Sequence, residues 1–190
     1  MQPGQLVQGE RIGLSLGVEI EVKEHERWMR EALAEAARTL TAGDVPVGAV
    51  AVYDGQVVGR GHNRKEAARD PTAHAEMLAL QEAARMLGGW RLPGVTLYST
   101  LEPCPMCAGA MVQARLPCLV YAADDPKAGA AGSVMDLLNH DRLNHRVTVV
   151  RGILAQEARD LLQAFFKGLR DGSIPRWSAV WQGGRLALKK

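Results

Sequence analysis

Apolar and polar positions recur along the chain with two different periods, and these periods predict the secondary structure. Residues 21–40 place apolar side chains three and four positions apart with charges between them, which is typical of an amphipathic helix. Residues 45–61 place short apolar runs on either side of Asp54-Gly55, a pair that tolerates positive φ and favours a hairpin turn. Because the first run is apolar on both faces, we expect its strand to be buried between helices.

Beyond the hairpin, predicted helices and strands alternate up to residue 169. Asp70-Pro71-Thr72 offers capping and first-turn residues, and Gly88-Gly89 is a typical helix stop. The expected elements are a helix from 70 to 87, a strand at 95–101, a helix at 104–114, a strand at 118–122, a short helical piece near 134–138, a strand at 146–150 and a helix at 153–169. This order predicts an α/β fold, a three-layer α/β/α sandwich with a mixed five-stranded sheet.

The composition is that of a soluble, globular domain. The chain has 190 residues, of which 47% are hydrophobic and 23% charged, enough for a substantial core. A net charge of +2 excludes a histone-like polycation but permits a local patch that binds nucleic acid. We find no apolar stretch of the ~18–20 residues that a membrane helix needs and no secretory signal, so we expect a cytoplasmic protein. The domain is placed at 21–170, between a loose arm at 1–20 and a tail at 171–190, neither of which is assigned a function.

Three cysteines are present, which is too few for a disulfide scaffold in a chain of this length. Cys104 and Cys107 form a Cys-Pro-Met-Cys pair, whose spacing alone is compatible with a redox motif, half a zinc site or chance. A thioredoxin-like site is disfavoured because the pair does not follow an N-terminal β-α-β unit. Cys118 lies in an apolar run and is interpreted as an inert core thiol.

His74 supplies a third candidate ligand beside this cysteine pair. It lies near the start of one predicted helix, and Cys104 and Cys107 lie near the start of the next. One imidazole and two thiolates suit Zn²⁺, and three protein ligands leave a fourth position for water, as in catalytic zinc sites. The positive helix N-termini also favour the thiolates. We therefore predict one zinc ion per chain, held by these three residues.

Glu76 is the candidate catalytic residue. Since it is two positions from His74 on a helix, it does not share the direction of that ligand and is better placed to exchange protons with the water. Alone, a histidine or glutamate at a helix start is usually a cap or a dipole partner. Together, however, His-x-Glu and Pro-Cys-x-x-Cys form the signature of the zinc-dependent base deaminases.

At these residues the chain resembles the cytidine-deaminase-like superfamily and, within it, the bacterial tRNA-specific adenosine deaminases. The resemblance runs from about Trp28 to about Arg170. The segments that carry it are Val45-Pro46-Val47-Gly48-Ala49, His62-Asn63-Arg64, 70–76, 101–110, 127–133, Asn144-His145-Arg146-Val147 and Phe165-Phe166-Lys167. The zinc segments are shared across base deaminases, whereas 127–133 and 144–146 point to the tRNA enzymes.

The resemblance implies a cytidine-deaminase-like fold and a zinc-dependent deaminase domain at 21–170. It also implies hydrolytic deamination of adenosine to inosine at the wobble position of a tRNA anticodon, by a homodimer whose two subunits contact the anticodon loop. By the same resemblance Asn63 would bind the edge of the flipped base, and Asp125 would bind the neighbouring nucleotide. From the residues alone, spacing favours a turn residue at Asn63, and Asp125 reads as a helix or turn cap before Pro126. For Phe165-Phe166, core packing of the last helix is at least as well supported as stacking on RNA.

Two departures from the family bear on RNA binding. Asp124 stands where many relatives have a basic residue, and the end of the last predicted helix is less basic than is common in the family. The first alternative function is therefore a free-base or nucleoside deaminase, for guanine or cytosine, with the same zinc site. A second alternative is a zinc-stabilised binding module without catalysis, which the presence of Glu76 argues against.

Overall fold

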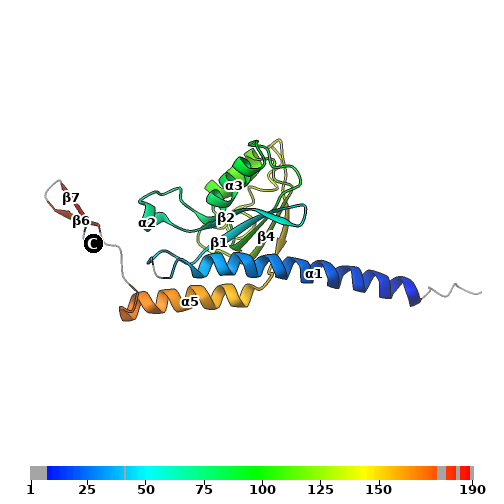
Figure 1. The fold of residues 1–190 in the computed structure, drawn as a ribbon, viewed down its shortest axis with the longest axis horizontal. Coiled ribbons are helices and arrows are strands. Elements are labelled where there is room, and N and C mark those ends of the chain that lie inside the picture. The colour runs from blue at the N-terminus through cyan, green and yellow to red at the C-terminus, as the bar shows by residue number, and fades with distance from the viewer. Residues whose placement is uncertain (1–7, 41, 175–178, 183–184, 189–190) are drawn as a thin grey trace, which may run out of the picture.

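The computed structural model describes residues 8–40, 42–174, 179–182 and 185–188, which form a mixed five-stranded sheet, helices on both of its faces, and a separate two-stranded sheet near the C-terminus (Figure 1). The elements are α1 (Gln8–Ala37), β1 (Gly48–Tyr53), β2 (Gln56–His62), α2 (Lys65–Ala68), α3 (Ala75–Met86), β3 (Thr96–Leu101), α4 (Pro105–Gln113), β4 (Cys118–Ala123), β5 (Thr148–Arg151), α5 (Ala155–Asp171), β6 (Ala179–Gln182) and β7 (Arg185–Leu188). None of the described helices is both long enough and apolar enough to span a membrane.

The strand order in the main sheet is β2-β1-β3-β4-β5. β1 runs antiparallel to both β2 and β3, whereas β3, β4 and β5 are parallel to one another. Asp54 and Gly55 both have positive φ, of 48° and 65°, which confirms the predicted hairpin turn. As a result, the start of β1 lies at the same edge of the sheet as the ends of β2, β3 and β4.

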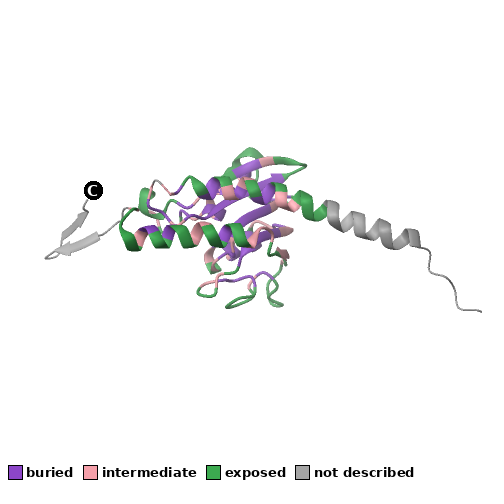
Figure 2. Ribbon diagram, turned by 90° about the horizontal axis from the view of Figure 1, so that it is seen from below, coloured by how far each residue is buried: buried purple, intermediate pink, exposed green. Residues whose placement is uncertain are grey.

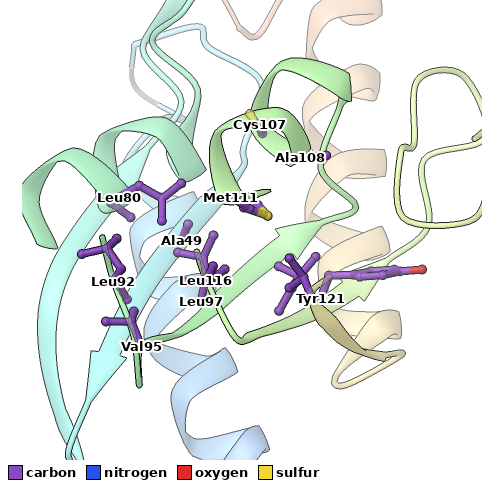
Figure 3. Close-up of a cluster of buried hydrophobic side chains, with 14 of the residues drawn as sticks. Ala49, Leu80, Leu92, Val95, Leu97, Cys107, Ala108, Met111, Leu116 and Tyr121 are labelled. Carbon is purple, nitrogen blue, oxygen red and sulfur yellow. The ribbon is translucent and has the colours of Figure 1, made fainter. Parts of the chain in front are cut away.

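Two helical layers cover the sheet, so the predicted three-layer α/β/α sandwich is confirmed. Helices α1 and α5 lie on one face, and α3 and α4 lie on the other (Figures 1 and 2). The apolar core of the α3 and α4 face includes Ala49, Leu97 and Met111 (Figure 3). Val50 and Tyr98, one position along their strands, belong to the core under α1. The first strand is therefore buried on both faces, as its apolar sequence predicted.

Glycines allow strand β2 to approach helix α3 closely. A Cβ atom built on Gly61 would lie 2.1 Å from the carbonyl oxygen of Ala75, and one on Gly59 would lie 2.2 Å from that of Ala79. Since real Cβ atoms do not come that near to a backbone oxygen, any side chain here would push the helix away from β2. The first turn of α3 is thus seated directly on the end of a strand.

Some predicted boundaries were wrong, each for a local reason. Helix α1 begins at Gln8, so residues 8–20 are helical rather than a loose arm; no proline interrupts this stretch, and a helix propagates easily once formed. Helix α3 begins at Ala75 rather than at Asp70, because the Asp70 carboxylate closes a turn onto the Thr72 N–H at 2.7 Å. The short helix α2 was not predicted, and residues 1–7 lie outside the described residues.

The segment near residues 134–138 forms no helix, contrary to the prediction. The N–H groups of Val134 and Met135 both donate to the carbonyl oxygen of Gly129, and that of Leu137 donates to Ala130. The backbone donors are therefore engaged with the preceding loop instead of with a helical turn. In the predicted tail, β6 and β7 pair antiparallel, although no element was predicted there.

Candidate metal centre and pocket

A pocket with a volume of about 150 Å³ opens at the edge of the sheet where the start of β1 meets the ends of β2, β3 and β4. Its lining residues are Val45, Val47, Asn63, Lys65, His74, Ala75, Glu76, Leu101, Glu102, Cys104 and Asp125. The candidate residues Asn63, His74, Glu76, Cys104 and Asp125 are thus all brought to one place. Cys107 lies behind the pocket wall and is fully buried.

The three candidate ligands meet because two helices begin at this edge. His74 is the N-cap of α3 and Cys104 is the N-cap of α4, both in extended backbone conformations, and Cys107 follows in the first turn of α4. Pro105 occupies the first helical position, where its missing N–H costs nothing. The Nδ1 atom of His74 lies 3.6 Å from Cys104 Sγ and 3.5 Å from Cys107 Sγ, and the two sulfurs are 3.7 Å apart.

This triangle has the dimensions of a zinc site. With Zn–S bonds of about 2.3 Å, Zn–N bonds of about 2.0–2.1 Å and tetrahedral angles, two sulfurs should be roughly 3.8 Å apart and a sulfur and a nitrogen roughly 3.6 Å apart. The three measured separations, 3.5–3.7 Å, lie close to these values. The donor set, one imidazole nitrogen and two thiol sulfurs, is the set that zinc prefers. The residues present therefore fit a tetrahedral zinc ion with one open position.

Contacts within the triangle shift the pKa values of the two thiols in opposite directions. The hydrogen bond from the Cys107 thiol, together with that from His74, lowers the pKa of Cys104 to about 3. The same hydrogen bond and burial raise the pKa of Cys107, which keeps its proton. The bond to Cys104 raises the pKa of His74. Because a metal takes up deprotonated ligands, zinc binding here should release a proton from Cys107.

Glu76 lies in the first turn of α3, with only 3% of its surface exposed. Burial raises the pKa of its carboxyl to about 7. Since a group with a pKa near neutrality can both accept and donate a proton, Glu76 has the character of a general acid–base. Its place in the pocket lining, next to His74 and Cys104, puts it beside the candidate metal position but outside the ligand triangle.

Asn63 makes the structural contacts of a turn residue, as its spacing predicted, and it also lines the pocket. Its side-chain nitrogen donates to the carbonyl oxygen of Val45 at 3.1 Å, which ties the end of β2 to the segment before β1. Its side-chain oxygen accepts a long bond of 3.4 Å from the Lys65 N–H. The side chain is held in one orientation, and its oxygen, only weakly engaged, remains able to accept a hydrogen bond from a ligand in the pocket.

Asp125 likewise combines a cap with a place at the pocket. Its Oδ1 atom accepts from the N–H groups of Lys127 at 2.9 Å and Ala128 at 3.2 Å, as the capping alternative predicted. Its neighbour Asp124 is exposed and accepts a hydrogen bond from the Tyr121 hydroxyl at 3.1 Å. Asp125 is among the residues that line the pocket, whereas Asp124 is not.

Two residues of the pocket were not identified from the sequence. Glu102 ends up 1% exposed, with a carboxylate that accepts three backbone N–H groups of the loop after β4. Lys65 lines both this pocket and the next depression. Glu102 could have been noticed as a charged residue between an apolar strand and Pro103-Cys104. For Lys65 no sequence pattern indicates a place in the pocket.

A broader groove continues from the pocket along α5. A depression of about 320 Å³ shares Val45, Asn63 and Lys65 with the pocket and reaches Phe166, and one of about 780 Å³ continues beyond it. The second depression is lined by Lys127, Asp160, Gln163, Ala164, Phe166, Lys167 and Arg170. Phe165 is 1% exposed and packs in the interior, whereas Phe166 is 44% exposed. Phe165 thus fits the core-packing alternative, and Phe166 has an exposed ring at the groove.

Comparisons with known proteins agree with this geometry. The family model of MafB19-like deaminases matches residues 23–170. The chain is 50% identical over 145 residues to the tRNA-specific adenosine deaminase of Bacillus subtilis strain 168, covering 76% of this chain and 90% of that protein. A tRNA-specific adenosine deaminase of Aquifex aeolicus is 46% identical over 149 residues, covering 78% and 98%.

Solved structures include relatives of both candidate functions. One, from studies of A-to-I editing by tRNA:A34 deaminases at the wobble position of transfer RNA, has a TM-score of 0.69 and 42% identity, covering 72% of this chain and 99% of its own. A guanine deaminase from Nitrosomonas europaea has a TM-score of 0.64 and 26% identity, covering 74% and 83%. The predicted fold is confirmed by both, and the tRNA deaminase is the more similar of the two.

Proposed function

The chain belongs to the MafB19-like deaminase family, among the relatives of the bacterial tRNA-specific adenosine deaminases, and on this premise we propose that it deaminates adenosine to inosine at the wobble position of a tRNA anticodon. The observation that carries the proposal is the His74–Cys104–Cys107 triangle beside the buried Glu76, in a chain that is 50% identical over 145 residues to the Bacillus subtilis enzyme. We place the deaminase domain at 21–170.

His74, Cys104 and Cys107 would hold one zinc ion. Zinc bound there supplies Lewis-acid chemistry, lowering the pKa of a water at its open position so that the water becomes a nucleophile near neutral pH. The chain contributes a fixed ligand triangle at two helix N-termini, whose dipoles stabilise the thiolates. It also contributes a pocket that positions the base against this centre.

Glu76 would move the protons of the reaction. In hydrolytic deamination a water oxygen adds to C6 of adenine, the C6–N6 bond breaks, and ammonia leaves. We infer that the carboxylate of Glu76 takes a proton from the attacking water and delivers it to ring nitrogen N1, and that it then takes the remaining hydroxyl proton to the departing amino group. A pKa of about 7 suits both halves of this cycle.

Asn63 and Asp125 would position the substrate. The Val45 contact fixes the Asn63 amide so that its oxygen can accept from the edge of the base. Asp125 has its Oδ1 atom engaged by the loop, and its other carboxylate oxygen would bind a hydroxyl of the adjoining nucleotide. A purine splayed out of a single-stranded loop can enter such a pocket at small cost in stacking energy.

The groove along α5 favours RNA over a free base. A free base needs only the pocket of about 150 Å³, whereas the adjoining depressions add an exposed aromatic ring, Phe166. They also add the cations Lys65, Lys127, Lys167 and Arg170, interspersed with the acidic Asp44, Glu66 and Asp160. Cations bind phosphates and an exposed ring can stack on a base, so this combination is typical of single-stranded RNA binding.

We further propose that the enzyme is a homodimer in the cytoplasm, where tRNA is its substrate. The loop that carries Asp125 also exposes Val134, Met135 and Leu143, at 51%, 45% and 39%. A second copy of the chain covering these side chains would bring its own residues towards the same groove. Light scattering with size-exclusion chromatography should give twice the mass of one chain; a monomeric mass at micromolar concentration would contradict the dimer.

The decisive experiment compares substrates. The zinc-loaded protein is incubated with anticodon stem-loops that carry adenosine at the wobble position, with matched stem-loops that carry guanosine there, and with free adenosine, guanine and cytosine. We expect ammonia and inosine from the adenosine stem-loops alone. Deamination of free guanine or cytosine without activity on any stem-loop would support the alternative, a free-base deaminase.

A further inference from the structure

The carboxylate of Glu102 holds the loop between β4 and β5 at three points. Its Oε2 atom accepts the Asp125 N–H at 2.9 Å, and its Oε1 atom accepts the N–H groups of Ala131 and Ser133, each at 3.0 Å. The side chain is 1% exposed, and no ion pair joins it to a cation in the described part of the chain. The buried negative charge of Glu102 is thus stabilised by backbone N–H groups of a single loop.

Gly129 lets this loop wrap closely around the carboxylate. A Cβ atom on Gly129 would lie 2.2 Å from Glu102 Oε2, 2.3 Å from its carboxyl carbon and 2.6 Å from the Asp125 carbonyl oxygen. The Gly129 N–H also donates to that carbonyl oxygen at 2.9 Å. The loop therefore closes on the carboxylate from two sides, and the residue between them cannot carry a side chain in this arrangement.

The same loop brings Asp125 to the pocket. Glu102 is joined through Pro103 to Cys104, a candidate metal ligand, so one short stretch of chain bears both the clamp and the metal site. Asp125 has its backbone held by Glu102 and its Oδ1 atom held by the N–H groups of Lys127 and Ala128. The distance between the nucleotide-facing carboxylate and the metal site is thereby fixed through the Glu102 side chain.

We propose that Glu102 is a positioning residue for the substrate: it sets the loop bearing Asp125 at a fixed distance from the metal site, and it takes no part in proton transfer. This inference rests on the proposed function of the pocket. A carboxylate is required because it has only acceptors. A glutamine side chain has the same shape but carries an oxygen and an NH₂ group. If its oxygen accepted from the N–H groups of Ala131 and Ser133, its NH₂ group would face the Asp125 N–H, and two donors would then meet without an acceptor.

Glu102→Gln therefore tests the clamp with little change in volume. We expect amide exchange of Asp125, measured by NMR, to accelerate roughly 10-fold or more, because a charge-assisted hydrogen bond is lost. The zinc content should remain at one per chain. On an adenosine stem-loop, the KM should rise roughly 10-fold, with a smaller change in kcat, since contacts made equally in the ground and transition states act on KM.

A double-mutant cycle with Asp125→Asn separates positioning from general destabilisation. If Glu102 acts through Asp125, the double variant should lose little more than Glu102→Gln alone, because residues that act on one contact are not additive. Gly129→Ala should reproduce the raised KM by pushing the loop from the other side with Glu102 intact. Glu35→Gln is the matched control, since it removes a buried carboxylate of the α1 face, 5% exposed, that pairs with Arg38 and Arg60 and contacts His62 at 3.3 Å rather than the loop after β4.

Three results would overturn the inference. The first is unchanged exchange of the Asp125 amide in Glu102→Gln and in Gly129→Ala. The second is faster exchange with unchanged stem-loop kinetics, and the third is full additivity with Asp125→Asn. Should the wild-type protein deaminate no stem-loop, the proposed function fails, while the exchange measurement still decides whether the carboxylate holds the loop.

Discussion

Substituting Gly61 by alanine should damage the catalytic centre without touching any of its side chains. The new Cβ atom would lie 2.1 Å from the Ala75 carbonyl oxygen and 2.8 Å from the Ala79 nitrogen. Contacts of this kind are not found below 3.0 Å, so β2 and the first turn of α3 must separate by about 1 Å. Ala75 stands between the candidate ligand His74 and the candidate acid–base Glu76, and both would move with it.

Two magnitudes follow from this displacement. Overpacking of a buried contact typically costs about 1–3 kcal/mol of unfolding free energy. A misplacement of about 1 Å at a catalytic centre typically costs about 10²-fold in rate. We therefore expect Gly61→Ala to fold with reduced stability and to turn over at roughly one hundredth of the wild-type rate, even with zinc in excess.

Gly59→Ala is the matched control for this prediction. Its Cβ atom would lie 2.2 Å from the Ala79 carbonyl oxygen, an equal clash one turn farther along α3. The loss of stability, measured by denaturant unfolding, should be similar, while zinc content and kcat should be affected less. Wild-type stability and activity in Gly61→Ala, or an equal loss of activity in both variants, would refute the reasoning that the first turn is seated on Gly61.

Further predictions concern the metal, the acid–base and the groove. His74→Ala and Cys107→Ser should each purify with almost no zinc by metal analysis, and retention of one ion per chain would rule out the triangle as the site. Glu76→Gln should keep its zinc and lose about 10²–10⁴-fold in kcat, whereas more than a tenth of the wild-type rate would show that Glu76 is not the proton carrier. Phe166→Ala should weaken stem-loop binding about 5- to 150-fold by anisotropy with normal stability, and Phe165→Ala should lose about 3–5 kcal/mol of stability instead; the reverse pattern would contradict their assignments.

The triangle of His74, Cys104 and Cys107 could be predicted from the sequence because it is built from two short segments. The two segments that hold its residues were placed at helix starts, and His74 and Cys104 are the N-caps of α3 and α4, although α3 begins at Ala75 rather than at Asp70. The hairpin at Asp54-Gly55 is equally local. In contrast, residues 134–138 have helical spacing in the sequence but donate their N–H groups to the carbonyls of a preceding loop, and no periodicity records such a bond.

The pocket residues come from separate segments of the chain, and they meet at one edge of the sheet only because of the order and direction of the strands. The sequence does not specify that order. Asn63 reaches the pocket because β2 ends beside the start of β1, and the start of β1 lies beside the end of β3. Had β1 paired parallel to β3, the end of β2 and the turn before Cys104 would lie at opposite edges of the sheet. Resemblance to a family could therefore suggest the position of Asn63, whereas the residues around it in the sequence could not.

Glu76 and Glu102 show how the same buried side chain acquires opposite properties at one site. Burial raises the pKa of Glu76 to about 7, so that its proton can come and go near neutrality. Burial also acts to raise the pKa of Glu102, but hydrogen bonds from Ser133, Asp125 and Ala131 outweigh it and lower the pKa instead. A carboxylate that satisfies three N–H groups is held in its charged form and cannot serve as an acid near pH 7. The two carboxyls differ because the folded loop supplies N–H donors to Glu102, which hold it in its charged form. Glu76 is therefore suited to carry protons, and Glu102 is suited to hold the chain in place.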